Sequence, residues 1–117
     1  VAREYYESLG FEVEDKSKLR GLGFDYLCKK DQQIIEVEVK ATTGIFGEVI
    51  ITKKELDNAR DSNNDTALFV VYGIEFEKYD KKLIGVGGEF TILDNWLPKD
   101  SELTPLSFRY RMSLFDN

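Results

Sequence analysis

Apolar and charged residues alternate most regularly over residues 34–40, which read Ile-Ile-Glu-Val-Glu-Val-Lys. A period of two is typical of a strand that buries one face. The residues expected to face a core are Ile35, Val37 and Val39. The residues that then share the opposite face are Glu36, Glu38 and Lys40. All three successive positions on this strand face are charged, and this calls for a physical explanation.

A second strand is expected directly before this one. Residues 23–30 have alternating and aromatic content, and Asp31-Gln32 has the character of a turn. In a hairpin centred on that turn, Asp25 stands opposite Glu38. Directly opposed side chains lie about 5 Å apart at Cβ, where two carboxylates repel each other. A divalent cation would reverse the sign of that interaction, because hard cations bind carboxylate oxygens.

The remaining periodicity predicts an α/β fold, with a mixed central sheet flanked by helices. The other expected elements are a helix over residues 1–9, a strand over 11–14, a short strand over 49–51, a helix from the capping box of Thr52 and Glu55 to Asn63-Asn64, and a buried strand over 66–73. Additional C-terminal strands are expected over 83–86 and 89–93, as a hairpin turning at Gly87-Gly88, and over 108–112.

The length and composition fit one domain. The chain has 117 residues, of which 42% are hydrophobic and 13% aromatic, enough for one core. It begins at Val1 inside a helical pattern, so residues 1–117 are expected to be a single domain of a larger multidomain protein. Cys28, expected opposite Ile35 as a small core residue, is the only cysteine and has no internal disulfide partner. With no signal peptide and no membrane-length apolar run, the expected location is cytoplasmic.

The sequence contains no histidine, and its formal net charge is −6. The absence of histidine excludes Ser-His-Asp and Cys-His catalysis and histidine-ligated zinc. Catalysis would have to use carboxylates, Lys, Tyr or Cys. The negative charge opposes nucleic-acid binding by this domain alone, since phosphate neutralisation needs Lys and Arg. Metal-binding carboxylates would inflate that negative count, and neighbouring domains can supply a basic surface.

Two motifs carry a family resemblance. Asp25, followed by Glu38-Val39-Lys40, resembles the Asp…Glu-x-Lys signature of the PD-(D/E)XK nuclease superfamily. More narrowly, residues 21–25 (Gly-Leu-Gly-Phe-Asp) and 36–42 (Glu-Val-Glu-Val-Lys-Ala-Thr) resemble the uncharacterised C-terminal domain of the plant protein NO VEIN, also found in bacterial restriction and helicase proteins. The resemblance covers roughly residues 1–75 and is weaker at 106–110. It implies a restriction-endonuclease-like core of order α-β-β-β-α-β.

The resemblance also implies a chemistry. Asp25 and Glu38 would bind Mg²⁺ or Mn²⁺ with help from the Val39 carbonyl, and Lys40 would position or activate the attacking water. The expected activity is endonucleolytic cleavage of nucleic acid, with DNA as the expected substrate and with help from other domains. The alternative is a module that keeps the fold and binds nucleic acid or a protein partner without cleaving it. The choice between DNA and RNA, the specificity and the oligomeric state stay open.

Five further charged residues are weaker candidates. Glu4 and Glu7 lie three apart on the first helix and share a face; one of them would be the additional carboxylate that the resemblance implies near the metal, and surface exposure is the alternative. Glu36 is either a supporting carboxylate or a solvated or salt-bridged residue. Lys53 and Lys54 begin a helix, where positive charge opposes the macrodipole. They indicate either an anionic partner or merely two exposed side chains.

Overall fold

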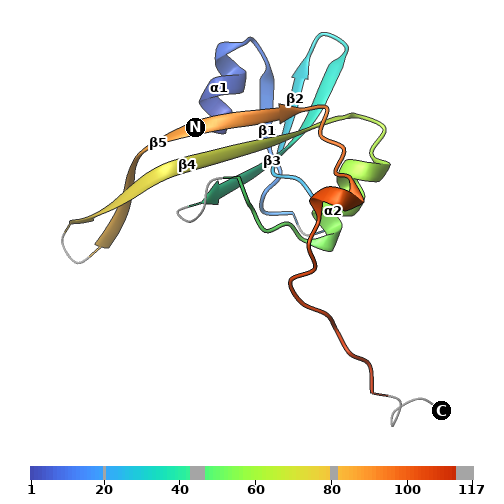
Figure 1. Ribbon diagram of the computed structural model, residues 1–117. Coiled ribbons are helices and arrows are strands. Elements are labelled where there is room, and N and C mark those ends of the chain that lie inside the picture. Colours follow the sequence, from blue (N-terminus) through green and yellow to red (C-terminus); the bar gives the residue numbers. More distant parts are fainter. Residues whose placement is uncertain (20, 43–46, 80–81, 113–117) are drawn as a thin grey trace.

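A five-stranded mixed sheet, in the order β1-β2-β3-β4-β5, forms the centre of the computed structural model (Figure 1). The structure describes residues 1–19, 21–42, 47–79 and 82–112, and it describes side chains in this part outside 74–87. The strands are β1 (Glu12–Asp15), β2 (Tyr26–Lys30), β3 (Gln33–Thr42), β4 (Asp65–Tyr79) and β5 (Lys82–Asp94). The helices are α1 (Ala2–Ser8), α2 (Lys53–Asp61) and the short 3-10 helix η1 (Asp100–Glu102). The expected mixed sheet with flanking helices is confirmed.

The hairpin of β2 and β3 has the register expected from the sequence. Cys28 pairs with Ile35 and Lys30 pairs with Gln33. Asp31 takes a left-handed φ of 54° in the turn, a conformation that aspartate tolerates better than most residues. Asp25 comes just before β2, and the strand pairing therefore brings it alongside the second half of β3.

Helix α2 connects β3 to β4, which run parallel, as a parallel pair requires a long crossover. The capping box is present: the Thr52 hydroxyl accepts from the Glu55 amide over 3.2 Å, and the Glu55 carboxylate accepts from the Thr52 amide over 2.8 Å. Residues 66–71 of β4 are all buried, and Phe69 is completely so. The predicted buried strand is confirmed, although β4 continues to Tyr79.

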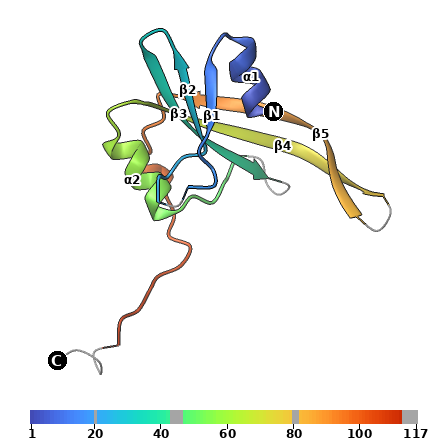
Figure 2. The ribbon, with the colours of Figure 1, turned by 180° about the vertical axis from the view of Figure 1, so that it is seen from behind.

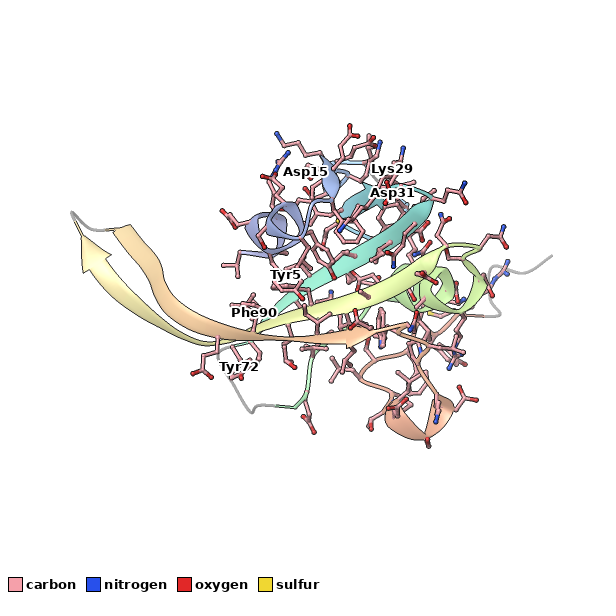
Figure 3. The ribbon with its side chains drawn as sticks, turned by 90° about the horizontal axis from the view of Figure 1, so that it is seen from above. Tyr5, Asp15, Lys29, Asp31, Tyr72 and Phe90 are labelled. Carbon is pink, nitrogen blue, oxygen red and sulfur yellow. The ribbon has the colours of Figure 1, made fainter. Side chains whose placement is uncertain are left out.

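The two α-helices, α1 and α2, cover opposite faces of the sheet (Figures 1 and 2). On the α1 face, Tyr6 packs with the apolar side chains of alternate strand positions such as Cys28, Val37 and Phe69. Burial raises the pKa of the Cys28 thiol to about 11, which fits the expected core residue and not a nucleophile. Figure 3 shows Tyr5 reaching from α1 toward Phe90 of β5, with ring centroids 5.3 Å apart.

The predicted hairpin at Gly87-Gly88 is wrong. Residues 82–94 form one strand, and β5 pairs along its length with β4. Gly73 and Gly88 lie opposite each other between the paired positions, with φ of 67° and 104°. These left-handed conformations bend the two-stranded ribbon (Figure 1) without reversing the chain. The glycines that indicated a turn therefore produce a bend.

Two other predicted strands are also absent from the described part of the chain. Residues 49–51 form no strand and lead into the Thr52 cap. Residues 108–112 run away from the sheet (Figure 1), and Phe108 and Tyr110 are each 86% exposed. Alternation alone does not make a strand, because a strand also needs a hydrogen-bonded neighbour. No helix within the described residues has the length and apolar content to cross a membrane.

Candidate active site

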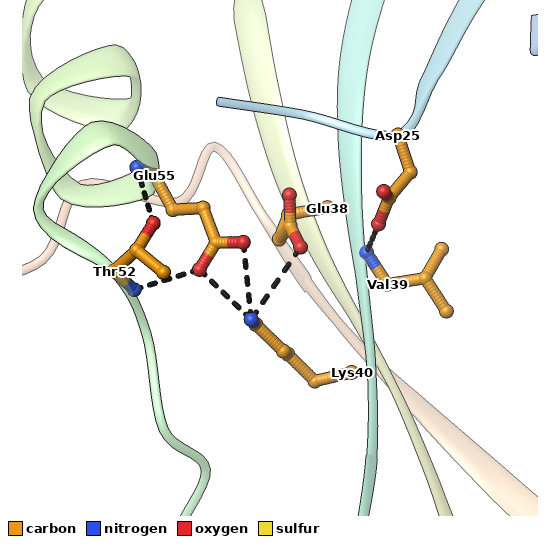
Figure 4. A network of polar contacts seen from close by, with 6 residues as sticks. All are labelled: Asp25, Glu38, Val39, Lys40, Thr52 and Glu55. Carbon is orange, nitrogen blue, oxygen red and sulfur yellow. Dashed lines mark hydrogen bonds and ion pairs between the residues drawn. The ribbon is translucent and has the colours of Figure 1, made fainter. Parts of the chain in front are cut away.

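A cleft of about 190 Å³ lies between the loop that precedes β2 and the first turn of α2. Three carboxylate residues line it, one from each of three neighbouring segments: Asp25 before β2, Glu38 on β3 and Glu55 on α2. Lys40 follows Glu38 on the same face of β3 (Figure 4). The structure thus brings together Asp25, Glu38 and Lys40, as expected, and adds Glu55.

Asp25 is bonded to β3 twice. Its amide donates to the Val37 carbonyl over 2.9 Å, and its carboxylate accepts from the Val39 amide, also over 2.9 Å (Figure 4). The backbone groups of alternate strand residues point to the same neighbouring strand. The Val39 carbonyl therefore points from β3 toward the β2 side, where Asp25 lies.

Glu38 is a buried acid among like charges. Its side chain is on the α2 face, only 5% of the residue is exposed, and its pKa is raised to about 9. Burial is the main cause, followed by a hydrogen bond with Glu55 and the negative charges of Asp25 and Glu55; Lys40, 3.7 Å away, opposes the shift. Glu38 therefore holds a proton near neutral pH and donates it in the hydrogen bond to Glu55.

Glu55 holds Lys40 in place. Its two carboxylate oxygens lie 2.8 and 3.0 Å from Lys40 Nζ (Figure 4). Burial, the largest single influence, raises the pKa of Glu55, but the hydrogen bonds from Lys40, the Thr52 amide and Glu38 together bring it below its usual value. Glu55 is therefore the charged partner of Lys40. From the sequence, Glu55 was predicted only as part of the capping box of α2.

Glu36 connects β3 to the end of α2 through buried hydrogen bonds. It is buried, and its carboxylate accepts from Asn58 Nδ2 over 2.9 Å, Ser62 Oγ over 2.8 Å and Asn64 Nδ2 over 2.9 Å. The expected solvated or salt-bridged position is wrong, because the carboxylate is buried and, among the residues that the structure describes, its partners are uncharged hydrogen-bond donors. These bonds connect the C-terminal end of α2 to β3, so Glu36 supports the wall of the cleft from a distance.

The two glutamates of α1 are not brought to the site. Glu4 and Glu7 have side chains 79% and 51% exposed, and Glu7 pairs with Arg3 over 2.8 Å. Helix α1 covers the face of the sheet opposite to the one that α2 covers (Figure 2), and Glu38 lies on the α2 face. Surface exposure, the alternative considered for both, is confirmed.

The donor set of the cleft fits a small hard cation. Within the described residues, no three Cys, Asp or Glu side chains form a metal-ligand group. Mg²⁺ nevertheless needs only one or two carboxylates, because it keeps several water ligands. Asp25 and Glu38 would supply these carboxylates, and the Val39 carbonyl would supply a third oxygen. Glu38 would have to release its proton on binding.

Fold and site define a mixed α/β protein whose carboxylate-lysine cluster lies between the central strand and the crossover helix. The family model described as Protein NO VEIN, C-terminal, matches residues 1–84, the greater part of the chain, and includes every residue of this cluster. The chain therefore belongs to that family. No significant match was found among curated proteins or solved structures.

Proposed function

We propose that this domain is a metal-dependent endonuclease that cleaves phosphodiester bonds, with DNA as the substrate. The observation that carries the proposal is that Asp25 and Glu38 line one cleft between the loop before β2, β3 and α2, with Lys40 Nζ 3.7 Å from the Glu38 carboxyl group. The order of elements, α-β-β-β-α-β with β5 added, supports the assignment of a restriction-endonuclease-like core within the PD-(D/E)XK superfamily.

The side chains have distinct roles in this proposal. Asp25 and Glu38 would hold Mg²⁺ or Mn²⁺, whose chemistry is to lower the pKa of a bound water and to polarise the scissile phosphate. The Val39 amide fixes the orientation of Asp25. Lys40 lies between Glu38 and Glu55, which suits it to position the attacking water and to offset charge on the phosphate oxygens. Glu55 is a positioning residue, because it acts through Lys40.

The test is cleavage of DNA by the purified chain with Mn²⁺. Glu38→Ala and Asp25→Ala are expected to abolish cleavage, because each removes a carboxylate from the cleft. Glu7→Ala, which removes an exposed carboxylate on the opposite face, is the matched control and is expected to cleave normally. Unchanged cleavage by Glu38→Ala would exclude Glu38 from the mechanism.

A second candidate function, binding without cleavage, is favoured by the way the cluster satisfies its own charges. The raised pKa of Glu38 keeps this residue uncharged near neutral pH, and Lys40 is paired with Glu55, so these three residues need no ion to offset their charges. Calorimetric titration with Mn²⁺ separates the two functions. Heat that disappears in Asp25→Ala supports the enzyme, whereas no such heat, together with retained DNA binding, supports the binding module.

A further inference from the structure

A second cavity lies on the α1 face of the sheet, away from the candidate active site. Its volume is about 360 Å³, within the range of small-molecule sites. The lining residues come from α1 and the turn after it, from the first residues of β3 and β4, and from the end of β5. Its walls are aromatic near α1 and acidic at the ends of the strands.

The acidic wall consists of Asp65 and Asp94. Asp94 pairs with Ala67 on the neighbouring strand, so Asp65, two residues before Ala67, is its diagonal neighbour on the same face, about 7 Å away. Neither carboxylate forms an ion pair within the described residues, and no Lys or Arg is among the lining residues. Within the described part of the chain, these two adjacent acidic residues thus have no positively charged partner.

Two hydrogen bonds connect the segment that follows Asp94 to the start of β4. After β5, the Trp96 amide donates to the Thr66 carbonyl over 2.8 Å, and the Thr66 hydroxyl donates to the Trp96 carbonyl over 2.6 Å. Asn95, between Asp94 and Trp96, takes a left-handed φ of 50°, which is uncommon for a residue with a side chain. These bonds fix the position of Asp94 next to the start of β4.

A buried hydroxyl adds a second, independent sign of a ligand. Tyr6, which lines the cavity, is only 3% exposed, and its hydroxyl has no hydrogen-bond partner among the residues that the structure describes. An unpaired buried polar group costs free energy. Burial and then the charge of Asp94, which lines the same cavity, raise the pKa of this hydroxyl. The rings of Tyr5 and Phe11 stand edge-to-face with Tyr6, at 5.1 and 5.7 Å.

We propose that this cavity binds an organic cation, namely an ammonium or guanidinium group on an apolar stem. Asp65 and Asp94 supply the opposite charge, the Tyr6 hydroxyl supplies a hydrogen bond, and the aromatic walls bury the stem and attract the cation. The group belongs either to a free amine or to a Lys or Arg side chain of a protein. The site is on the opposite face of the sheet from Glu38, so this proposal does not depend on the nuclease activity.

The first test is a titration with butylguanidine, followed by amide NMR of the full chain. Saturable shifts centred on Asn95 and Tyr6 are expected. Butylurea has nearly the same shape without the charge, and it is expected to bind about tenfold more weakly or less, because charge-assisted hydrogen bonds are about twice as strong as neutral ones. Equal binding of the two compounds, or no saturable binding, would overturn the proposal.

The second test uses isosteric variants. Asp65→Asn and Asp94→Asn are each expected to weaken butylguanidine binding about tenfold, and Tyr6→Phe to weaken it less. Asp61→Asn removes the same charge from exposed α2 on the other face and is expected to bind normally. Unchanged binding in the first three variants would overturn the proposal. An arginine-containing peptide that binds more tightly than butylguanidine would indicate a protein ligand, and equal affinity a free amine.

Discussion

Glu38 has the most perturbed environment among the residues of the candidate active site. Its pKa is raised to about 9, chiefly by burial, whereas in the unfolded chain it returns to the usual value near 4. Between these two values the folded protein binds a proton that the unfolded chain has released. The stability that Glu38 contributes is therefore fully present below about pH 4 and is lost progressively as the pH rises toward 9.

This linkage predicts a measurable change in Glu38→Gln. The neutral amide has no proton to lose, so the variant is expected to keep its free energy of unfolding between pH 5 and 9 better than the wild type. Urea unfolding at several pH values measures the difference. Glu12→Gln, at an exposed position on β1, is the control and should follow the wild type. A parallel decline in wild type and Glu38→Gln would contradict the raised pKa.

At the scale of elements, the hairpin of β2 and β3 was predictable because its information is local. The turn at Asp31 fixes the register, and the register places Asp25 beside the end of β3. The alternation over residues 34–40 likewise put Glu38 and Lys40 on one face. Three of the four charged residues in the cluster were therefore identified before the fold was known.

The contribution of α2 was not predictable in the same way. Glu55 meets Lys40, and Asn58 meets Glu36, only because the crossover to a parallel strand lays α2 on the charged face of β3. One signal was available: a carboxylate in the first turn of the helix that covers that face. The bend at Gly73 and Gly88 was missed because glycine permits a turn and a bend equally well.

The connection between α2 and β3 leads to a stability prediction. Glu36→Ala leaves Asn58, Ser62 and Asn64 without their acceptor, and it is expected to lower the free energy of unfolding by about 3 kcal/mol. Chemical denaturation measures this loss. Glu48→Ala, at an exposed position outside the helices and strands, should change it little. A similar small effect in both variants would show that the three bonds do not stabilise α2.

At the scale of the whole molecule, the two candidate sites lie on opposite faces of one sheet and both are rich in carboxylates. With a formal net charge of −6, the domain must rely on local cations to approach a polyanion. Lys54 lines the cleft, near Gly21, and has no ion pair in the part of the chain that is described. Its neighbour Lys53 is paired with Asp57 over 2.7 Å.

The two lysines therefore offer a matched comparison. Lys54→Ala is expected to weaken DNA binding and to reduce the slope of log affinity against log salt by about 1, whereas Lys53→Ala should change neither. Fluorescence anisotropy with labelled DNA measures both quantities, in a Glu38→Ala background that prevents cleavage. Equal effects of the two substitutions would mean that DNA responds to overall charge and not to the cleft.

The double attachment of Asp25 to β3 couples the chemistry of the cleft to the integrity of the sheet. Its amide bonds to the Val37 carbonyl and its carboxylate bonds to the Val39 amide. Separation of this part of β3 from the segment before β2 would therefore displace Asp25 and the Val39 carbonyl in the same event. The exchange rate of the Val39 amide proton with solvent deuterium therefore reports directly how often the cluster comes apart.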